Sequence, residues 1–213
     1  MVARASLALP RFPCMSPSER RFLFLLSSPR RLGNSEQLAY CAAHPPPPGT
    51  AQQWLHLLDF PLPDFADLRH NGPYQLPTGN AQLLLEATLH ATDLVLVAPL
   101  YWYSLPAPVK LYLDHWSAWL RTPELNFRAR MQNKALWAII VSSGERAEAQ
   151  PLADTLKLTA NYLQMQWGGL LFGTGSRPND IQSDAQALHR ARSFFASVPT
   201  PRVATEAEVA PHQ

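Results

Sequence analysis

Residues 27–35 combine hydroxyl groups with arginine just before a predicted helix. Ser28 supplies a hydroxyl, Arg30 a planar guanidinium that can donate two parallel hydrogen bonds, and Asn34 and Ser35 begin the helix. A helix N-terminus presents unpaired N–H groups and roughly half a positive charge, so this loop could hold a phosphate group. The residues alone leave open an ordinary helix cap flanked by surface arginines, and the Gly-Lys-Ser/Thr ending of a Walker A loop is absent.

Three consecutive aromatic side chains, Tyr101, Trp102 and Tyr103, follow a predicted strand. They lie in a proline-rich stretch that starts at Pro99 and Leu100 and whose prolines restrict the backbone on both sides. A stiff aromatic loop can hold a flat, partly apolar ring system, but aromatic residues also seal sheet edges and subunit interfaces. Both roles are possible at once if the ring site lies at an interface.

A third polar loop runs from Ser142 to Glu145 and contains Ser143 and Gly144. Glycine lets the backbone approach a ligand closely, and its N–H can point at a ring oxygen or nitrogen. A Ser-Ser-Gly turn is also a common way to leave a strand, so this motif is a weak signal by itself.

Five short apolar runs predict buried β-strands, at residues 22–26, 54–58, 94–98, 135–141 and 169–172. Good helix-forming stretches between and after them predict helices at residues 35–43, 81–91, 107–120, 152–166 and 183–195. The strands begin roughly 32 to 41 residues apart, which is the length of a strand-helix unit with its loops.

This strict alternation predicts an α/β fold with a doubly wound, five-stranded parallel sheet and helices on both faces. Right-handed crossovers and five strands favour the flavodoxin-like order 2-1-3-4-5. Ligands of such sheets bind at the carboxyl ends of the strands, beside the first and third strands. The three loops follow the first, third and fourth strands, so the fold would bring them to one edge.

The composition fits one compact domain with tails. The chain has 213 residues, 46% of them hydrophobic and 21 of them proline, which argues against disorder and against a helical rod. A formal net charge of +2 is too small for a nucleic-acid or membrane-surface partner, and no apolar run reaches the length of a membrane span. Cys14 and Cys41 are too few for a disulfide framework, which fits a cytoplasmic protein, and the histidine spacing predicts no metal.

The two ends of the chain differ from the middle. Residues 1–18 contain Arg4, Arg11 and three prolines but no acidic residue. We expect residues 1–19 to be a disordered arm or a wrongly assigned gene start, residues 20–198 to be the flavodoxin-like domain, and residues 199–213 to be a disordered tail.

Together the loops resemble those of the NAD(P)H-dependent FMN reductases of the flavodoxin-like superfamily. Ser28-Pro29-Arg30 followed by Gly33-Asn34-Ser35 is similar to that family's phosphate loop. The stretch 99–110, running on to Asp114, is similar to its flavin-ring loop and following helix, and residues 142–144 to its third flavin loop. The resemblance covers about residues 20–197 in matching order.

The resemblance implies an oxidoreductase that passes electrons from NADPH or NADH through bound FMN to a quinone, azo compound, metal species or flavin. The flavin carries the chemistry, so no catalytic side chain is required. The implied FMN contacts are, around the phosphate, Ser28, Arg30, Asn34 and Ser35; along the ribityl chain and ring, Pro99, Leu100, Tyr101, Trp102 and Tyr103; and near the polar edge of the ring, Ser143 and Gly144. Relatives often complete the site with a partner subunit, so a homodimer or a dimer of dimers is expected.

The sequence also departs from the family's pattern. Ser27 stands where glycine is common, Trp102 and Tyr103 replace an Asn-Gly pair, and Glu145 replaces a second glycine. These bulkier residues could narrow the site above the flavin. They therefore bear on the identity of the electron acceptor more than on the expectation that FMN is bound. Two alternatives stay open: an FMN-binding electron carrier without a nicotinamide site, which the low net charge disfavours, and a flavin-free interaction module.

Overall fold

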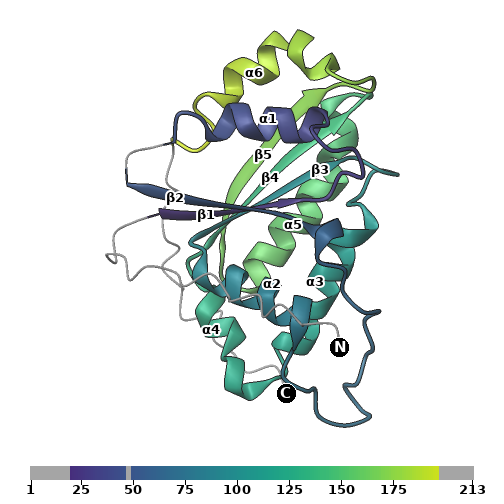
Figure 1. The fold of residues 1–213 in the computed structure, drawn as a ribbon, viewed down its shortest axis with the longest axis vertical. Coiled ribbons are helices and arrows are strands. Elements are labelled where there is room, and N and C mark those ends of the chain that lie inside the picture. Colours follow the sequence, from purple (N-terminus) through teal and green to yellow (C-terminus); the bar gives the residue numbers. More distant parts are fainter. Residues whose placement is uncertain (1–19, 47–48, 197–213) are drawn as a thin grey trace, which may run out of the picture.

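The computed structural model describes residues 20–46 and 49–196, which form a five-stranded parallel sheet (Figure 1). The strands are β1 (Arg20–Leu26), β2 (Thr50–His56), β3 (Asp93–Pro99), β4 (Ala135–Ser142) and β5 (Gln166–Thr174). Their order is β2-β1-β3-β4-β5, with all neighbours parallel, which confirms the predicted flavodoxin-like topology. The expected arm 1–19 and tail 199–213 lie outside the described residues.

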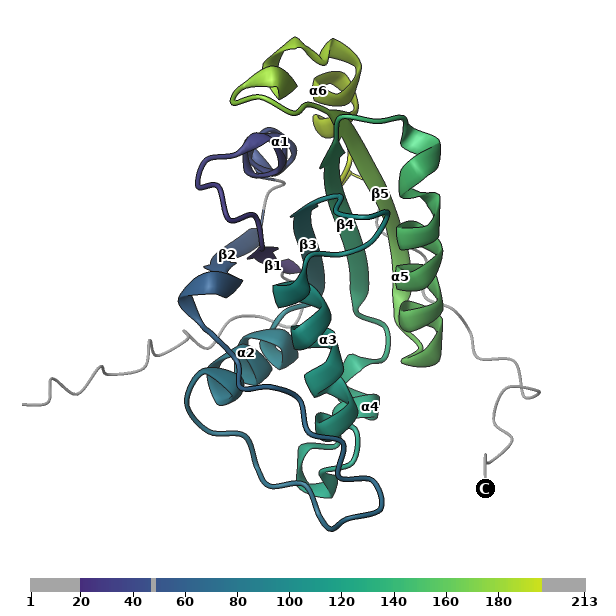
Figure 2. The ribbon, with the colours of Figure 1, turned by 90° about the vertical axis from the view of Figure 1, so that its right-hand side faces the viewer.

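Helices cover both faces of the sheet (Figure 2). One face carries α1 (Asn34–Ala43) and α6 (Ala185–Ala191). The other carries α2 (Gly79–His90), α3 (Ala107–Trp119), α4 (Phe127–Met131) and α5 (Gln150–Tyr162). No helix of the described chain combines the length and the apolar character that crossing a membrane requires.

The first strand shows why its near-continuous apolar run folds as a central strand. Leu23 and Leu25 point into the core under α2, α3 and α5, whereas Phe22, Phe24 and Leu26 point into the core under α1 and α6. Successive side chains of a strand alternate between faces, so a strand buried on both faces needs apolar residues at every position.

Several element boundaries differ from the sequence-based expectation. Leu57 and Leu58 were expected in the second strand, but β2 ends at His56 and these residues begin a 3-10 turn, η1 (Leu57–Asp59). β2 instead starts earlier, at Thr50, because an edge strand can include polar residues that face solvent. The last helix begins at Ala185, because the Asp184 side chain caps it by accepting from the Ala187 N–H at 2.9 Å, and it ends at Ala191, earlier than expected.

A glycine at the start of β5 makes room for a large side chain of β4. The Trp137 side chain is fully buried, and a Cβ atom added to Gly168 would lie 2.2 Å from its ring. The register of the two strands shifts at this point, and Gly169 has a φ of +122°. The sheet therefore accommodates the indole only because residue 168 has no side chain.

Replacing Gly168 by alanine is expected to lower the free energy of unfolding by about 1 to 3 kcal/mol, because the methyl group overpacks the Trp137 ring. Urea denaturation measures the loss. In a Trp137→Phe background the same substitution should cost less, since the smaller ring leaves space. An equal cost in both backgrounds would show that the Trp137 contact is not the cause.

Candidate functional site

Three loops meet at the carboxyl edge of the sheet around a cavity of about 270 Å³. β1 ends at Leu26, opposite Val97 of β3, and the Ser27 N–H donates to the Val97 carbonyl at 3.0 Å. The Leu100 N–H donates to the Val141 carbonyl at 2.9 Å, which joins the second and third loops. The cavity is lined by Ser28, Pro29, Arg30, Gly33, Asn34, Ser35, Pro99, Leu100, Tyr101, Val141, Ser142, Ser143, Gly175 and Ser176.

One end of the cavity is rich in hydrogen-bond donors. The first turn of α1 opens here, and no side chain caps it, because the preceding residue is Gly33. Its free N–H groups, the hydroxyls of Ser28 and Ser35 and the guanidinium of Arg30 all border the cavity. This set of neutral and cationic donors fits the phosphate of a mononucleotide.

The loop that carries these donors is fixed by buried Glu36. Its carboxylate accepts from the Leu32 N–H at 2.6 Å, and Leu32 adopts a positive φ of 50°. The Ser28 hydroxyl accepts from the Arg30 N–H at 3.2 Å, which tightens the preceding turn. The donor groups are therefore positioned by the loop itself before any ligand binds.

Asn34 has a structural role within this corner. Its side-chain amide donates to the Arg177 carbonyl at 2.9 Å and accepts from the Ile181 N–H at 3.4 Å, so it ties α1 to the segment after β5. Arg30 donates to the Ser176 carbonyl of the same segment at 3.1 Å. Both polar atoms of the Asn34 side chain are thus hydrogen-bonded. The group of Asn34 that can still bind a ligand in the cavity is its backbone N–H.

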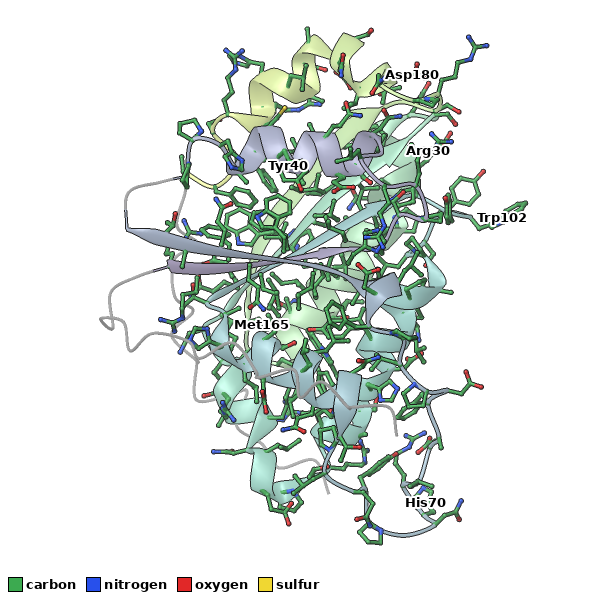
Figure 3. All side chains as sticks on the ribbon, in the orientation of Figure 1. Arg30, Tyr40, His70, Trp102, Met165 and Asp180 are labelled. Carbon is green, nitrogen blue, oxygen red and sulfur yellow. The ribbon has the colours of Figure 1, made fainter. Side chains whose placement is uncertain are left out.

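The aromatic loop divides into a part at the cavity and a part that faces solvent. Tyr101 and Ser104 exchange two backbone hydrogen bonds of 3.1 and 3.0 Å around a two-residue tip formed by Trp102 and Tyr103. Trp102 is 93% exposed, and Figure 3 shows it projecting away from the molecule. Tyr101 lines the cavity, but Trp102 and Tyr103 do not.

The tip has a backbone geometry that favours other residue types. Trp102 and Tyr103 have φ values of +51° and +60°. Two positive φ angles in a two-residue tip define the turn for which Asn-Gly is preferred, and large L-residues pay a steric cost there. Two aromatic residues at such positions indicate a role that outweighs local strain.

The third loop contributes differently from what the sequence indicated. Ser143 lines the cavity, whereas Gly144 lines a neighbouring one. The Gly144 N–H already donates to the Ser142 hydroxyl at 3.1 Å. The Glu148 carboxylate packs against Gly144, where an added Cβ would lie 2.0 Å from it. The Gly144 N–H is therefore not free to point at a ring.

The segment after β5 also contributes to the cavity, which was not expected from the sequence. Gly175 and Ser176 line the cavity although β5 is an edge strand two positions away from β3. The Gly175 N–H donates to the Ser142 carbonyl at 2.8 Å, which draws the segment inward. The small residues of the sequence 173–176, two of them glycine, were the available signal for a close approach of the backbone.

The sheet order, the position of the cavity beside β1 and β3, and the donors at a helix N-terminus define a flavodoxin-like mononucleotide-binding protein. Sequence comparison gives the particular family. The family NADPH-dependent FMN reductase matches residues 20–170, and the chain belongs to this family. The expected class, an NAD(P)H-dependent flavin oxidoreductase with FMN as cofactor, is confirmed at the level of the family.

Individual relatives agree with this placement. The chain is 29% identical over 162 residues to YwqN of Bacillus subtilis (strain 168), named as an NAD(P)H-dependent FMN-containing oxidoreductase, covering 75% of this chain and 87% of that one. The structure of the Trp repressor binding protein from Bacillus subtilis superposes with a TM-score of 0.66 at 24% identity, covering 82% and 97% of the two chains. An NAD(P)H:quinone oxidoreductase from Methanothermobacter marburgensis gives 0.61 at 15% identity, covering 92% and 100%. The two structures establish the shared fold.

Proposed function

We propose that the protein binds FMN in the carboxyl-edge cavity and uses NAD(P)H to reduce a small organic acceptor, with a quinone as the first candidate. The observation that carries this proposal is the donor set at one end of the cavity, formed by Ser28, Arg30, Ser35 and the uncapped start of α1. Bound FMN would supply the chemistry, because it accepts hydride from a nicotinamide and releases electrons to a second substrate.

The residues of the chain would bind and orient. Ser28, Ser35 and Arg30 would hold the phosphate, and the Asn34 and Ser35 N–H groups would add the favourable end of the helix dipole. Pro99, Leu100 and Tyr101 would border the ribityl chain and the ring, as their place on the cavity wall supports. Ser143 would lie at the polar edge of the ring, with its N–H as the donor there.

The electron carrier is the second candidate function. It would share the FMN site but would not oxidise a nicotinamide. The net charge of +2 argues against it, because it gives no sign of the acidic face that flavodoxins usually carry. A visible spectrum after incubation with FMN, followed by NADH and NADPH oxidation with a quinone, separates the possibilities. A flavin spectrum without nicotinamide oxidation would identify an electron carrier. If the protein bound no flavin, the flavin-free interaction module would be the remaining alternative.

We propose that the functional unit is a homodimer, or a dimer of dimers, in which a second copy covers the cavity. A cavity of about 270 Å³ with an open rim leaves most of an isoalloxazine ring in solvent. The two loops that border it carry exposed apolar side chains: Leu32 at 67%, Tyr101 at 46%, Trp102 at 93% and Tyr103 at 57%. Exposed aromatic groups around a site are typical of an interface.

Replacing Trp102 by Asn and Tyr103 by Gly together is expected to convert the dimer into a folded monomer. The Asn-Gly pair suits the two positive φ angles, so the turn is kept while its aromatic surface is removed. Light scattering would give half the wild-type mass, with an unchanged circular dichroism spectrum. Leu158→Ala on α5, where the side chain is 69% exposed, is the control and should keep the wild-type mass. If the double variant kept the wild-type mass, this loop would not be part of the interface.

We also infer a cytoplasmic location. Cys41 is a free, exposed thiol, and such groups persist in reducing compartments. Fractionation of the source cells with an antibody against the protein tests this inference.

A further inference from the structure

A second and larger cavity, of about 890 Å³, adjoins the proposed FMN cavity. Ser143, Gly175 and Ser176 line both, so the two cavities are neighbours at the ends of β4 and β5. Its other walls are the 3-10 turn η3 (Arg146–Ala149), the turn η4 (Asp180–Ser183) and one side of α6. Figure 3 shows Asp180 and Arg30 on neighbouring elements at this end of the molecule.

The lining of this second cavity is polar and mixed in charge. Four carboxylates and two guanidinium groups border it: Glu145, Glu148, Asp180, Asp184, Arg146 and Arg190. Carboxylates therefore outnumber cations on its walls. A ligand here would find guanidinium donors for a pyrophosphate and carboxylate acceptors for hydroxyl groups. The walls as a whole carry more negative than positive charge.

The carboxylates fall into two pairs. Asp180 accepts from the N–H groups of Ser176 and Arg177 at 3.0 and 2.7 Å, and these bonds lower its pKa, so it stays ionised. Asp184 accepts from Thr174 and Ala187 N–H groups and likewise holds the backbone.

Glu145 and Glu148 form no side-chain hydrogen bond or ion pair with any residue in 20–46 or 49–196. They are the carboxylates left for a ligand.

The arginines are also partly unused. Arg190 donates through Nη2 to the Phe172 carbonyl at 3.2 Å, but its buried Nε–H has no acceptor within the described chain. Arg146 lies on η3 at the wall of the cavity. Guanidinium groups with free donors are well suited to phosphate oxygens.

We propose that this second cavity binds the adenosine diphosphate half of the nicotinamide coenzyme and selects NADH over NADPH. Arg146 and Arg190 would contact the pyrophosphate, and Glu145 and Glu148 would accept hydrogen bonds from the adenosine ribose. This inference rests on the proposed function, because the nicotinamide must lie against FMN in the first cavity and the rest of the coenzyme must then extend into an adjoining one.

Other hollows fit this half of the coenzyme less well. A groove of about 420 Å³ between η1 and α3 is apolar apart from Asp64 and offers nothing to a pyrophosphate. A groove of about 690 Å³ contains Arg21, His90 and Arg130, but it lies by the residues that precede β3, at the opposite edge of the sheet. Of these three hollows, only the second cavity both contains cationic donors and adjoins the proposed FMN cavity.

The choice between the coenzymes follows from charge. NADPH differs from NADH by a phosphate on the adenosine ribose, which carries a charge of about −1.5 to −2 at neutral pH. Beside Glu145 and Glu148 this phosphate meets like charges and loses the hydroxyl that the carboxylates would bind. Exposed charges are screened by salt, so the discrimination should shrink at high ionic strength.

The test compares two fragments and two coenzymes on the FMN-loaded protein. Calorimetry should give a dissociation constant for AMP at least about tenfold lower than for adenosine 2′,5′-bisphosphate, which differs from AMP only by the 2′-phosphate. Steady-state kinetics with a quinone should give a kcat/KM ratio that favours NADH over NADPH to a similar degree. In Glu145→Gln/Glu148→Gln both preferences should fall by about tenfold, because the side chains keep their size but lose their charge. Glu124→Gln, an exposed carboxylate on the turn Pro123–Leu125, is the matched control and should keep both ratios.

Equal or tighter binding of the bisphosphate, or a kcat/KM ratio that favours NADPH, would overturn the inference. An unchanged preference in the double glutamine variant would overturn it as well. If the protein bound no FMN and oxidised neither coenzyme, the proposed function would fail instead, and the fragment titration would still decide whether the cavity prefers the fragment without the 2′-phosphate.

Discussion

Replacing Arg30 by alanine is expected to weaken FMN binding by about 1.5 to 3 kcal/mol, which is a factor of roughly 10 to 150 in the dissociation constant. Arg30 lines the cavity beside Ser28 and the start of α1, where the phosphate is proposed to lie. A charge-assisted hydrogen bond to a phosphate oxygen is stronger than a neutral one, and its loss leaves the serine hydroxyls and the helix N–H groups as the remaining donors. Fluorescence quenching of free FMN by the apoprotein measures the change.

The neighbouring arginine supplies a matched control. Arg31 pairs with the exposed carboxylate of Asp59, whose pKa this pairing lowers, and it does not line the cavity. Arg31→Ala should therefore bind FMN like the wild type, whereas Arg30→Lys should fall between wild type and Arg30→Ala because it keeps the charge but loses the planar fork. If Arg30→Ala bound FMN with wild-type affinity, the phosphate would have to lie elsewhere.

Replacing Asp93 by alanine is expected to lower the free energy of unfolding by about 3 to 5 kcal/mol. Asp93 is buried at the start of β3 and accepts from Arg20 Nη2 at 2.5 Å, from Trp137 Nε1 at 2.9 Å and from Thr92 Oγ1 at 2.7 Å. Removing the carboxylate leaves a largely buried guanidinium and a buried indole N–H without their acceptor. Urea denaturation at neutral pH measures the effect.

Two comparisons make this result specific. Asp93→Asn keeps one acceptor oxygen and should lose less stability than Asp93→Ala. Asp67→Ala, which removes an exposed carboxylate paired with Arg69, should leave stability nearly unchanged, because water replaces the lost contact. Asp93 lies at the opposite end of β3 from the cavity, so FMN affinity should stay at the wild-type value. A loss near that of Asp67→Ala would mean that the buried network contributes little to stability.

The candidate site was predictable where it depended on loops that follow strands. The spacing of strands and helices gave the sheet order, and that order places the residues after β1, β3 and β4 at one edge. Eight of the expected residues accordingly line one cavity: Ser28, Arg30, Asn34, Ser35, Pro99, Leu100, Tyr101 and Ser143. Their contacts with FMN stay predictions.

Residue type alone could not tell which way a loop side chain points. Trp102 and Tyr103 face solvent because their turn closes between Tyr101 and Ser104, a backbone contact that composition does not reveal. The position of Asn34 in the sequence predicts a helix cap or a phosphate contact. Its side-chain amide instead forms hydrogen bonds with the backbone of Arg177 and Ile181, more than 140 positions away. Gly175 and Ser176 join the cavity through one long-range bond to Ser142.

The sequence by itself determined the α/β fold and its strand order, because apolar periodicity and loop lengths are local properties that act through every strand-helix unit. It also placed the loop after β1 at the carboxyl edge of the sheet, where the loop lines the cavity. The tertiary structure decided which donors remain free, that Trp137 fits only over Gly168, and that a second charged cavity adjoins the first. These depend on contacts between residues far apart in the chain, and such contacts exist only after the sheet has brought their loops together.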